Sequence, residues 1–184
     1  MNGSAQSRQA AFASLAALLS SGDLAVREAV VQAAADPDAY LETFEETSER
    51  LWDVDDPARD PRLPWLALVD RLLAALRAVE IDWDSAKADI DWSLEQLIAW
   101  PRLPDVTRRA IAALTASASA IDTLQEIARL VAADGLRLAA MDIDSDSYVL
   151  LLLAAADYEQ ATAIADTLGF VLRDVREHDP NMSA

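Results

Sequence analysis

Apolar residues recur at helical spacing along the first two-thirds of the chain, and short polar segments interrupt the pattern. Residues 63–79 give the strongest such pattern, because apolar side chains leave only a narrow polar stripe. The same periodicity, with capping residues and prolines at the boundaries, predicts a series of helices. They are expected over residues 10–19 and 24–33, from Pro37 onward, and over residues 63–79, 85–100, 106–116 and 121–133.

The pattern changes after Gly135, where apolar residues form short runs that are typical of strands. Residues 136–143 and 148–155 predict two strands joined by a polar turn. The second strand is apolar on both faces, so we expect it inside a sheet with a helix covering at least one face. A helix that begins at Asp157 and a strand over residues 170–174 follow. A right-handed crossover places this last strand parallel to the second, while its pairing partner stays open.

These elements predict an α+β fold. A mostly helical N-terminal part, about residues 8–134, packs on a small C-terminal β-β-α-β unit, about residues 135–175, with a three-stranded mixed sheet. We expect one domain over residues 1–184, since no glycine-serine or proline-rich tether separates the two parts. Residues 121–133 carry an apolar stripe suited to covering the sheet. Residues 176–184 have nothing to pack against and are expected to form a loose tail.

The chain is strongly acidic, with 32 aspartates and glutamates against 15 lysines and arginines and a net charge of -17. Such a charge repels phosphate backbones and anionic membrane surfaces, so neither nucleic acid nor a membrane is expected as a partner. It favours encounter with a basic protein, although solubility alone would also explain it. The longest apolar run, residues 148–156, is far shorter than the ~20 residues that span a bilayer.

The chain lacks most of the residues on which common enzymes depend. It has no cysteine, which excludes disulfides, thiolate metal sites and cysteine nucleophiles and favours a cytoplasmic location. Its only histidine, His178, lies in the expected tail, and its four glycines are scattered singly rather than gathered in a phosphate-binding loop. No cofactor and no catalytic residue are therefore predicted, and a non-enzymatic role is favoured.

Alternating carboxylates at Asp142, Asp144 and Asp146 resemble the start of a calcium-binding loop. The match is incomplete, because Ser147 occupies the position of the turn glycine and Leu153 that of the bidentate glutamate. A hairpin tip explains the same residues, since aspartate and serine favour turns. A divalent-metal site with these three aspartates as ligands stays open as the alternative.

Trp92 lies outside the predicted apolar face of its helix, which carries Ile90, Leu94 and Leu97. We therefore expect a partly exposed tryptophan with acidic neighbours. These neighbours are Asp82, Asp84, Asp89, Asp91 and Glu95. An aromatic anchor in an acidic ring is typical of a binding hot spot for a basic protein. The alternative is that Trp92 packs against a neighbouring helix or subunit.

Two short sequences carry a resemblance to a known family. They are Glu80-Ile81-Asp82-Trp83, which lies near the end of residues 71–84, and Asp144-Ser145-Asp146-Ser147-Tyr148, within residues 138–150. They resemble the E-x-D-W and D-S-D-x-Y signatures of an uncharacterised bacterial domain family. The resemblance implies a bacterial protein and no particular catalytic residues. Of the 15 basic residues only Lys87 is a lysine, which also favours a bacterial origin.

These observations support three hypotheses about function. The first is a non-enzymatic interaction protein, similar in role to small acidic immunity or antitoxin proteins, that binds a basic protein. Its expected contact residues are Asp82, Asp84, Asp89, Asp91 and Trp92, together with the acidic stretch 42–60. The second is a carboxylate-based metal-binding or hydrolytic domain. The third is a homo-oligomeric structural protein in which a second copy covers Trp52, Trp65 or Trp100.

Overall fold

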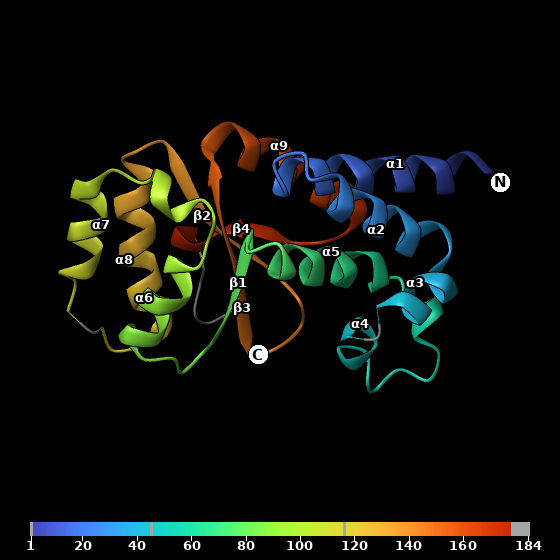
Figure 1. Cartoon of the computed structure of the whole chain (residues 1–184), viewed down its shortest axis with the longest axis horizontal. Helices are drawn as coiled ribbons and strands as arrows, with labels where there is room; N and C mark the ends of the chain where they lie inside the picture. The colour runs from blue at the N-terminus through green and yellow to red at the C-terminus, as the bar shows by residue number, and fades with distance from the viewer. Residues whose placement is uncertain (1, 45, 116, 178–184) are drawn as a thin grey trace. The chain divides into compact units, whose positions relative to one another are not determined.

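The structure is a computed structural model that describes residues 2–44, 46–115 and 117–177. It has an α+β fold with a four-stranded antiparallel sheet (Figure 1). The chain divides into two compact units. The first comprises the chain up to Ala75 together with Ala163–Phe170, and the second comprises Leu76–Thr162 together with the segment that starts at Val171.

The first unit is built from helices. They are α1 (Asn2–Leu19), α2 (Leu24–Ala35), α3 (Pro37–Thr43), α4 (Glu46–Glu49), the 3-10 helix η1 (Pro57–Arg59) and α5 (Leu63–Ala74). The carboxylate of Asp23 caps α2 by accepting a hydrogen bond from the Ala25 N–H at 2.9 Å, a role for which aspartate is well suited. α2 packs against both α1 and α5 (Figure 1). In the same unit, the ring of Trp65 from α5 stacks on that of Phe170, with centroids 4.8 Å apart.

The second unit combines helices with the sheet. Its helices are α6 (Lys87–Glu95), α7 (Asp105–Ala112), α8 (Ala120–Ala132) and the 3-10 helices η2 (Trp100–Arg102) and η3 (Val175–Glu177). α9 (Ala155–Leu168) contributes residues to both units. The strands are β1 (Ala78–Asp82), β2 (Leu136–Met141), β3 (Ser147–Ala154) and β4 (Leu172–Asp174), in the spatial order β1-β3-β2-β4. Each neighbouring pair is antiparallel.

α8 covers one face of this sheet. Leu124, Ile127 and Val131 of α8 are fully buried and belong to one apolar cluster with Leu138 of β2. α6 and α7, which lie beside α8 in Figure 1, add side chains to the same cluster. The apolar stripe predicted over residues 121–133 therefore covers the sheet as expected.

The prediction of a three-stranded mixed sheet is wrong, because the sheet has a fourth strand, β1, and every neighbouring pair of strands is antiparallel. The helical pattern over residues 63–79 continues into β1, but α5 ends at Ala74. Leu76 then takes a left-handed conformation with φ 54°, which turns the chain. Beyond this turn, Val79 and Ile81 are buried and Glu80 and Asp82 are exposed. This alternation has the period of two residues that is typical of a strand.

The other three strands agree more closely with the sequence pattern. β3 lies between β1 and β2, so the apolar run over residues 148–155 is inside the sheet. β4 pairs with β2, with Arg173 opposite Ala140. Because β3 and β4 are both antiparallel to β2, β4 is parallel in direction to β3, as a right-handed crossover predicts.

The helix predicted over residues 85–100 is shorter in the structure. α6 ends at Glu95, and a turn leads to η2, which has Pro101 in its first turn. Ile98, which the helical pattern places on the buried face, is 49% exposed. Its N–H donates to the Leu76 carbonyl at 2.9 Å, a bond that a continuous helix would not make.

Candidate functional site

A tight turn joins β1 to α6 and carries two of the predicted partner-binding residues. The Asp82 carboxylate accepts from the Asp84 N–H at 3.4 Å, and the Asp82 carbonyl accepts from the Ser85 N–H at 3.1 Å. The Trp83 N–H donates to the Asp146 carbonyl at 3.1 Å, which fastens the turn to the loop between β2 and β3. Such local bonds are typical of aspartate turns. The side chains of Asp82, Trp83 and Asp84 are all exposed.

α6 has one buried, apolar face and one exposed face. Ile90 and Leu94 are fully buried, whereas Trp92 between them is 66% exposed. Two residues advance a helix by about 200°, so a side chain between two buried ones points away from the core. The exposure predicted for Trp92 is confirmed, while its role in binding stays a prediction. We call five exposed side chains, from the end of β1 through α6, the 82–92 surface: Asp82, Trp83, Asp84, Asp89 and Trp92.

Unlike the other carboxylates of the predicted contact residues, Asp91 forms an ion pair within the described part of the chain. Its Oδ2 lies 2.5 Å from Nζ of Lys87, one helical turn earlier, and the two side chains are only 29% and 11% exposed. Asp82, Asp84 and Asp89 make no ion pair with any described residue. The 82–92 surface therefore presents three unpaired carboxylates, while Asp91 is engaged within the chain.

The three tryptophans of the homo-oligomer hypothesis have different surroundings. Trp52 lies in the acidic stretch 42–60 of the first unit and is 86% exposed. Trp65 and Trp100 are only 1% and 7% exposed. A second copy could therefore cover Trp52 but would find Trp65 and Trp100 already packed within the chain.

The aspartates of the predicted metal site lie in the loop between β2 and β3. Asp142 Oδ1 accepts from the Asp144 N–H at 3.1 Å, and Asp142 Oδ2 lies 3.2 Å from Nη2 of Arg173. Asp144 has a positive φ of 56°, a conformation that aspartate tolerates in turns. Within the part of the chain that the structure describes, which includes Asp146 but not His178, no three acidic or histidine side chains are placed to hold a metal ion. This geometry fits a hairpin loop and gives the metal-site prediction no support.

A pocket of about 550 Å³ opens between α6, η2 and α7 in the second unit. Its charged lining consists of Asp91, Glu95, Asp105, Arg108 and Arg109. Its apolar lining consists of Trp100, Pro101, Ile111 and Ala112. The volume falls in the range of ~300–1,000 Å³ that is usual for small-molecule sites. The pocket thus combines opposite charges with an apolar wall.

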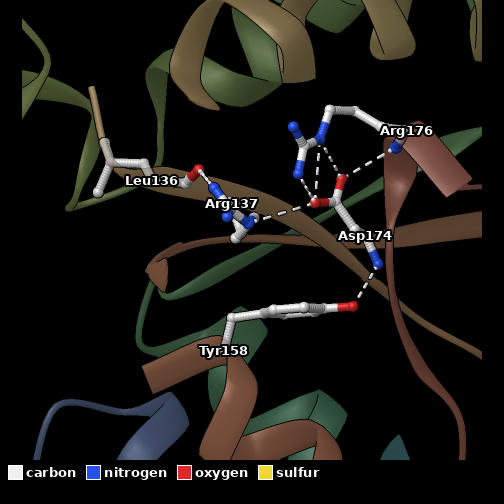
Figure 2. A network of polar contacts seen from close by, with 5 residues as sticks. All are labelled: Leu136, Arg137, Tyr158, Asp174 and Arg176. Carbon is white, nitrogen blue, oxygen red and sulfur yellow. Dashed lines mark hydrogen bonds and ion pairs between the residues drawn. The ribbon is translucent and has the colours of Figure 1, made fainter. Parts of the chain in front are cut away.

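Figure 2 shows a second cluster of charged residues, around Asp174 of β4. Nε of Arg176 donates to both carboxylate oxygens of Asp174 at 3.0 Å, and Nη2 donates to Oδ2 at 2.6 Å. Nε of Arg137, from β2, lies 3.5 Å from the same Oδ2. The Asp174 N–H donates to the Tyr158 hydroxyl at 2.8 Å. The network therefore ties β4 to β2 and to α9.

The network stabilises the fold rather than offering a reactive group. The Asp174 side chain is 1% exposed, and both of its oxygens accept hydrogen bonds from within the chain. The hydrogen bonds to Asp174 raise the pKa of Arg176 above its ordinary value, because they stabilise the charged guanidinium. Arg176 and Glu177 form part of η3, so the prediction of a loose tail is wrong for these two residues. Residues 178–184 lie outside the described residues.

Comparison with protein-family models matches residues 11–175 to a domain of unknown function, DUF6630. The chain belongs to the DUF6630 family. The match covers residues of both compact units. Comparisons with curated proteins and with solved structures found no match. The prediction that the chain belongs to an uncharacterised domain family is confirmed. The two signatures and the bacterial origin of this DUF6630 chain stay predictions.

A separate property concerns membranes. Among the described residues of the DUF6630 chain, no helix combines the length and the apolarity needed to cross a bilayer. The longest described helix, α1, has 18 residues, but polar side chains interrupt it along its first half.

Four features of this DUF6630 chain were not predicted from its sequence: the exposed turn at Trp83, the Lys87–Asp91 ion pair, the pocket and the Asp174 network. The turn-forming aspartates on either side of it, Asp82 and Asp84, are the signal that could have placed Trp83 in an exposed turn. The four-residue spacing of Lys87 and Asp91 is a signal for their ion pair. Arg137 meets Asp174 only because β2 pairs with β4, so no local pattern indicates that contact. The pocket likewise depends on how three separate elements pack.

Proposed function

We propose that this DUF6630 chain is a non-enzymatic interaction protein that binds a basic protein through its 82–92 surface. The observation that carries the proposal is the exposure of Trp83 and Trp92, at 59% and 66%, beside three carboxylates without ion pairs among the described residues. Tryptophan offers a large apolar area and is enriched in binding hot spots. A partner that covers both rings removes this apolar area from water, which favours association.

The charge of the chain supports a basic partner. A net charge of -17 accelerates encounter with positively charged proteins and opposes binding to nucleic acid or anionic membranes. Asp82, Asp84 and Asp89 meet no cation within the described chain, so lysine or arginine side chains of a partner would supply the opposite charge. In its narrower form, the proposal is a role like that of immunity or antitoxin proteins, which cover the basic surface of a toxin.

The aromatic and acidic residues are expected to contribute differently to binding. The change Trp92→Ala should weaken binding by about 2 kcal/mol, or about 30-fold, because it removes the apolar anchor. Each exposed carboxylate should contribute about 0.5 kcal/mol, mainly through the association rate. Asp91 is less suitable for this test, because its ion pair with Lys87 would mix effects on folding with effects on binding.

The experiment is affinity capture from a bacterial lysate at low and moderate salt, followed by titration of the purified captured protein. We expect the wild-type chain to retain a basic protein whose binding weakens as salt rises. Trp92→Ala and the double variant Asp84→Asn/Asp89→Asn should bind this protein more weakly. Leu24→Ala is the control, because it removes an exposed apolar side chain from the first unit, outside the acidic stretch 42–60, and it should bind like the wild type.

Three results would contradict the proposal. They are equal binding by wild type and Trp92→Ala, loss of binding in Leu24→Ala as well, and capture of only acidic proteins. Analytical ultracentrifugation of the chain alone distinguishes the homo-oligomer alternative. If the wild type self-associates and Trp92→Ala does not, the 82–92 surface binds a second copy rather than a basic protein.

A further inference from the structure

The pocket between α6, η2 and α7 is lined by charged residues that do not belong to the 82–92 surface. Two of its acidic side chains, Asp91 and Asp105, are paired with cations of the same chain. Glu95 and Arg109 are exposed and form no ion pair with any described residue. The pocket therefore presents one uncompensated carboxylate and one uncompensated guanidinium.

Arg109 is held at the pocket by its own helix. Its Nε donates to the Asp105 carbonyl at 3.2 Å, one turn earlier in α7. This bond leaves the two terminal nitrogen atoms for an external carboxylate, which a guanidinium can hold through two parallel hydrogen bonds. Glu95 lies one helical turn after Asp91 on α6, and both residues line the pocket.

Two polar atoms of the pocket residues lack a hydrogen-bond partner among the described residues. They are the acceptor Oδ1 of Asp91 and the donor Nε of Arg108. A buried donor or acceptor without a partner is unfavourable, so each gains from a ligand atom of the opposite kind. Both atoms are covered in this structure, so they mark charged groups of the pocket whose hydrogen bonding is incomplete. The pocket thus favours a ligand that carries both a donor and an acceptor.

We propose that this pocket binds a small zwitterion with an apolar body, of the class of amino acids and short peptides. The ammonium group lies against Glu95, the carboxylate lies against Arg109, and the apolar part covers Trp100 and Ile111. A ligand without net charge suits this chain, because a net charge of -17 repels free anions. A ligand with a single charged group would leave either Glu95 or Arg109 without a partner.

The test is a titration of the isotopically labelled full chain, with amide resonances of residues 91–112 followed by NMR. The probes are L-leucine and L-leucyl-L-leucine, which differ in the separation of ammonium and carboxylate. N-acetyl-L-leucyl-L-leucine and L-leucyl-L-leucinamide are the controls with one charge each. We expect saturable shifts at the pocket with at least one zwitterion, and about tenfold weaker binding of both controls, because each lacks one charged contact.

Variants of the two uncompensated residues complete the test. Glu95→Gln and Arg109→Gln should each weaken binding about tenfold without changing the melting temperature, since both side chains are exposed. Glu159→Gln and Arg129→Gln are matched controls, because both residues are exposed and lie outside the pocket lining. The proposal is overturned by the absence of saturable shifts with both zwitterions up to about 10 mM. Single-charge controls that bind as tightly as the zwitterions would overturn it as well. So would Glu95 and Arg109 variants that bind the zwitterion as tightly as the wild type.

Discussion

The 82–92 surface and the Asp174 network use charged residues in opposite ways. On the surface, Asp82, Asp84 and Asp89 are exposed and make no ion pair with described residues. In the network, the Asp174 side chain is 1% exposed, and Arg176 donates to both of its oxygens. A buried carboxylate needs partners because water no longer solvates it, whereas an exposed one is solvated without them.

This difference shows that acidity by itself does not separate structural from functional residues. The fold depends on Asp174, because a single carboxylate joins guanidinium groups from β2 and η3. The three aspartates of the 82–92 surface form no ion pair with any described residue, so they do not join two elements of the fold in this way. Substitutions in the network should therefore change stability, and substitutions on the surface should change binding.

The largest expected effect is that of Asp174→Asn on stability. We expect the free energy of unfolding to fall by about 3 kcal/mol, because Arg137 and Arg176 lose their carboxylate. These guanidinium side chains are 24% and 34% exposed, so water screens part of the loss. Urea denaturation followed by circular dichroism measures the change. Asp89→Asn is the matched control and should stay within about 0.5 kcal/mol of the wild type, since Asp89 is exposed. Equal losses in the two variants would remove the distinction between network and surface.

A second Asp-x-Arg segment sharpens the comparison. At Asp60, the Arg62 N–H donates to Oδ1 at 2.7 Å and Nη2 donates to Oδ2 at 2.9 Å. At Asp174, the Arg176 N–H donates to Oδ1 at 3.0 Å and Nη2 donates to Oδ2 at 2.6 Å. The local geometry is thus shared by the two segments. The Asp174 clamp differs in the contact that it makes with Arg137 across the sheet.

Arg137→Met measures what this contact across the sheet adds to the local clamp. We expect a loss of about 1 kcal/mol, smaller than that of Asp174→Asn, because Arg176 still neutralises the carboxylate. The methionine keeps most of the apolar length of the side chain, so packing changes little. The measurement is urea denaturation of the single variants and of the double variant Arg137→Met/Asp174→Asn. Additive losses would show that Arg137 stabilises the sheet independently of Asp174.

Features that depend on local spacing were predictable from the sequence. Asp23 caps α2, and Ser119 accepts from the Asp122 N–H at 3.2 Å at the start of α8, as the capping patterns predict. The exposure of Trp92 follows from its phase on α6 relative to Ile90. Each of these features is determined by residues within about one helical turn.

Features that depend on distant pairing were not predictable in the same way. β1 has five residues, and its apolar positions extend the helical pattern of α5, so the pattern alone favours helix. Its strand conformation is stabilised by pairing with β3, where Ile81 lies opposite Tyr148. The contact of Arg137 with Asp174 and the lining of the pocket likewise require the packed chain. The calcium-loop spacing of Asp142, Asp144 and Asp146 is another pattern that does not specify geometry by itself, since no three acidic or histidine side chains among the described residues are placed to hold a metal ion.

The smallest expected effect is that of Asp60→Asn, which tests the local clamp by itself. We expect the free energy of unfolding to fall by about 0.5 kcal/mol at neutral pH, because Arg62 is partly exposed and water screens the pair.

The side-chain hydrogen bonds from Arg62 lower the pKa of Asp60 below its ordinary value of 3.8. A carboxyl with a lowered pKa contributes stability that is fully present above its unfolded pKa and is lost as the pH falls through its folded pKa. The difference in unfolding free energy between wild type and Asp60→Asn should therefore shrink between about pH 5 and about pH 2. Urea denaturation over this range measures it, and a difference that stays constant with pH would show that the Arg62 clamp does not stabilise the ionised form of Asp60.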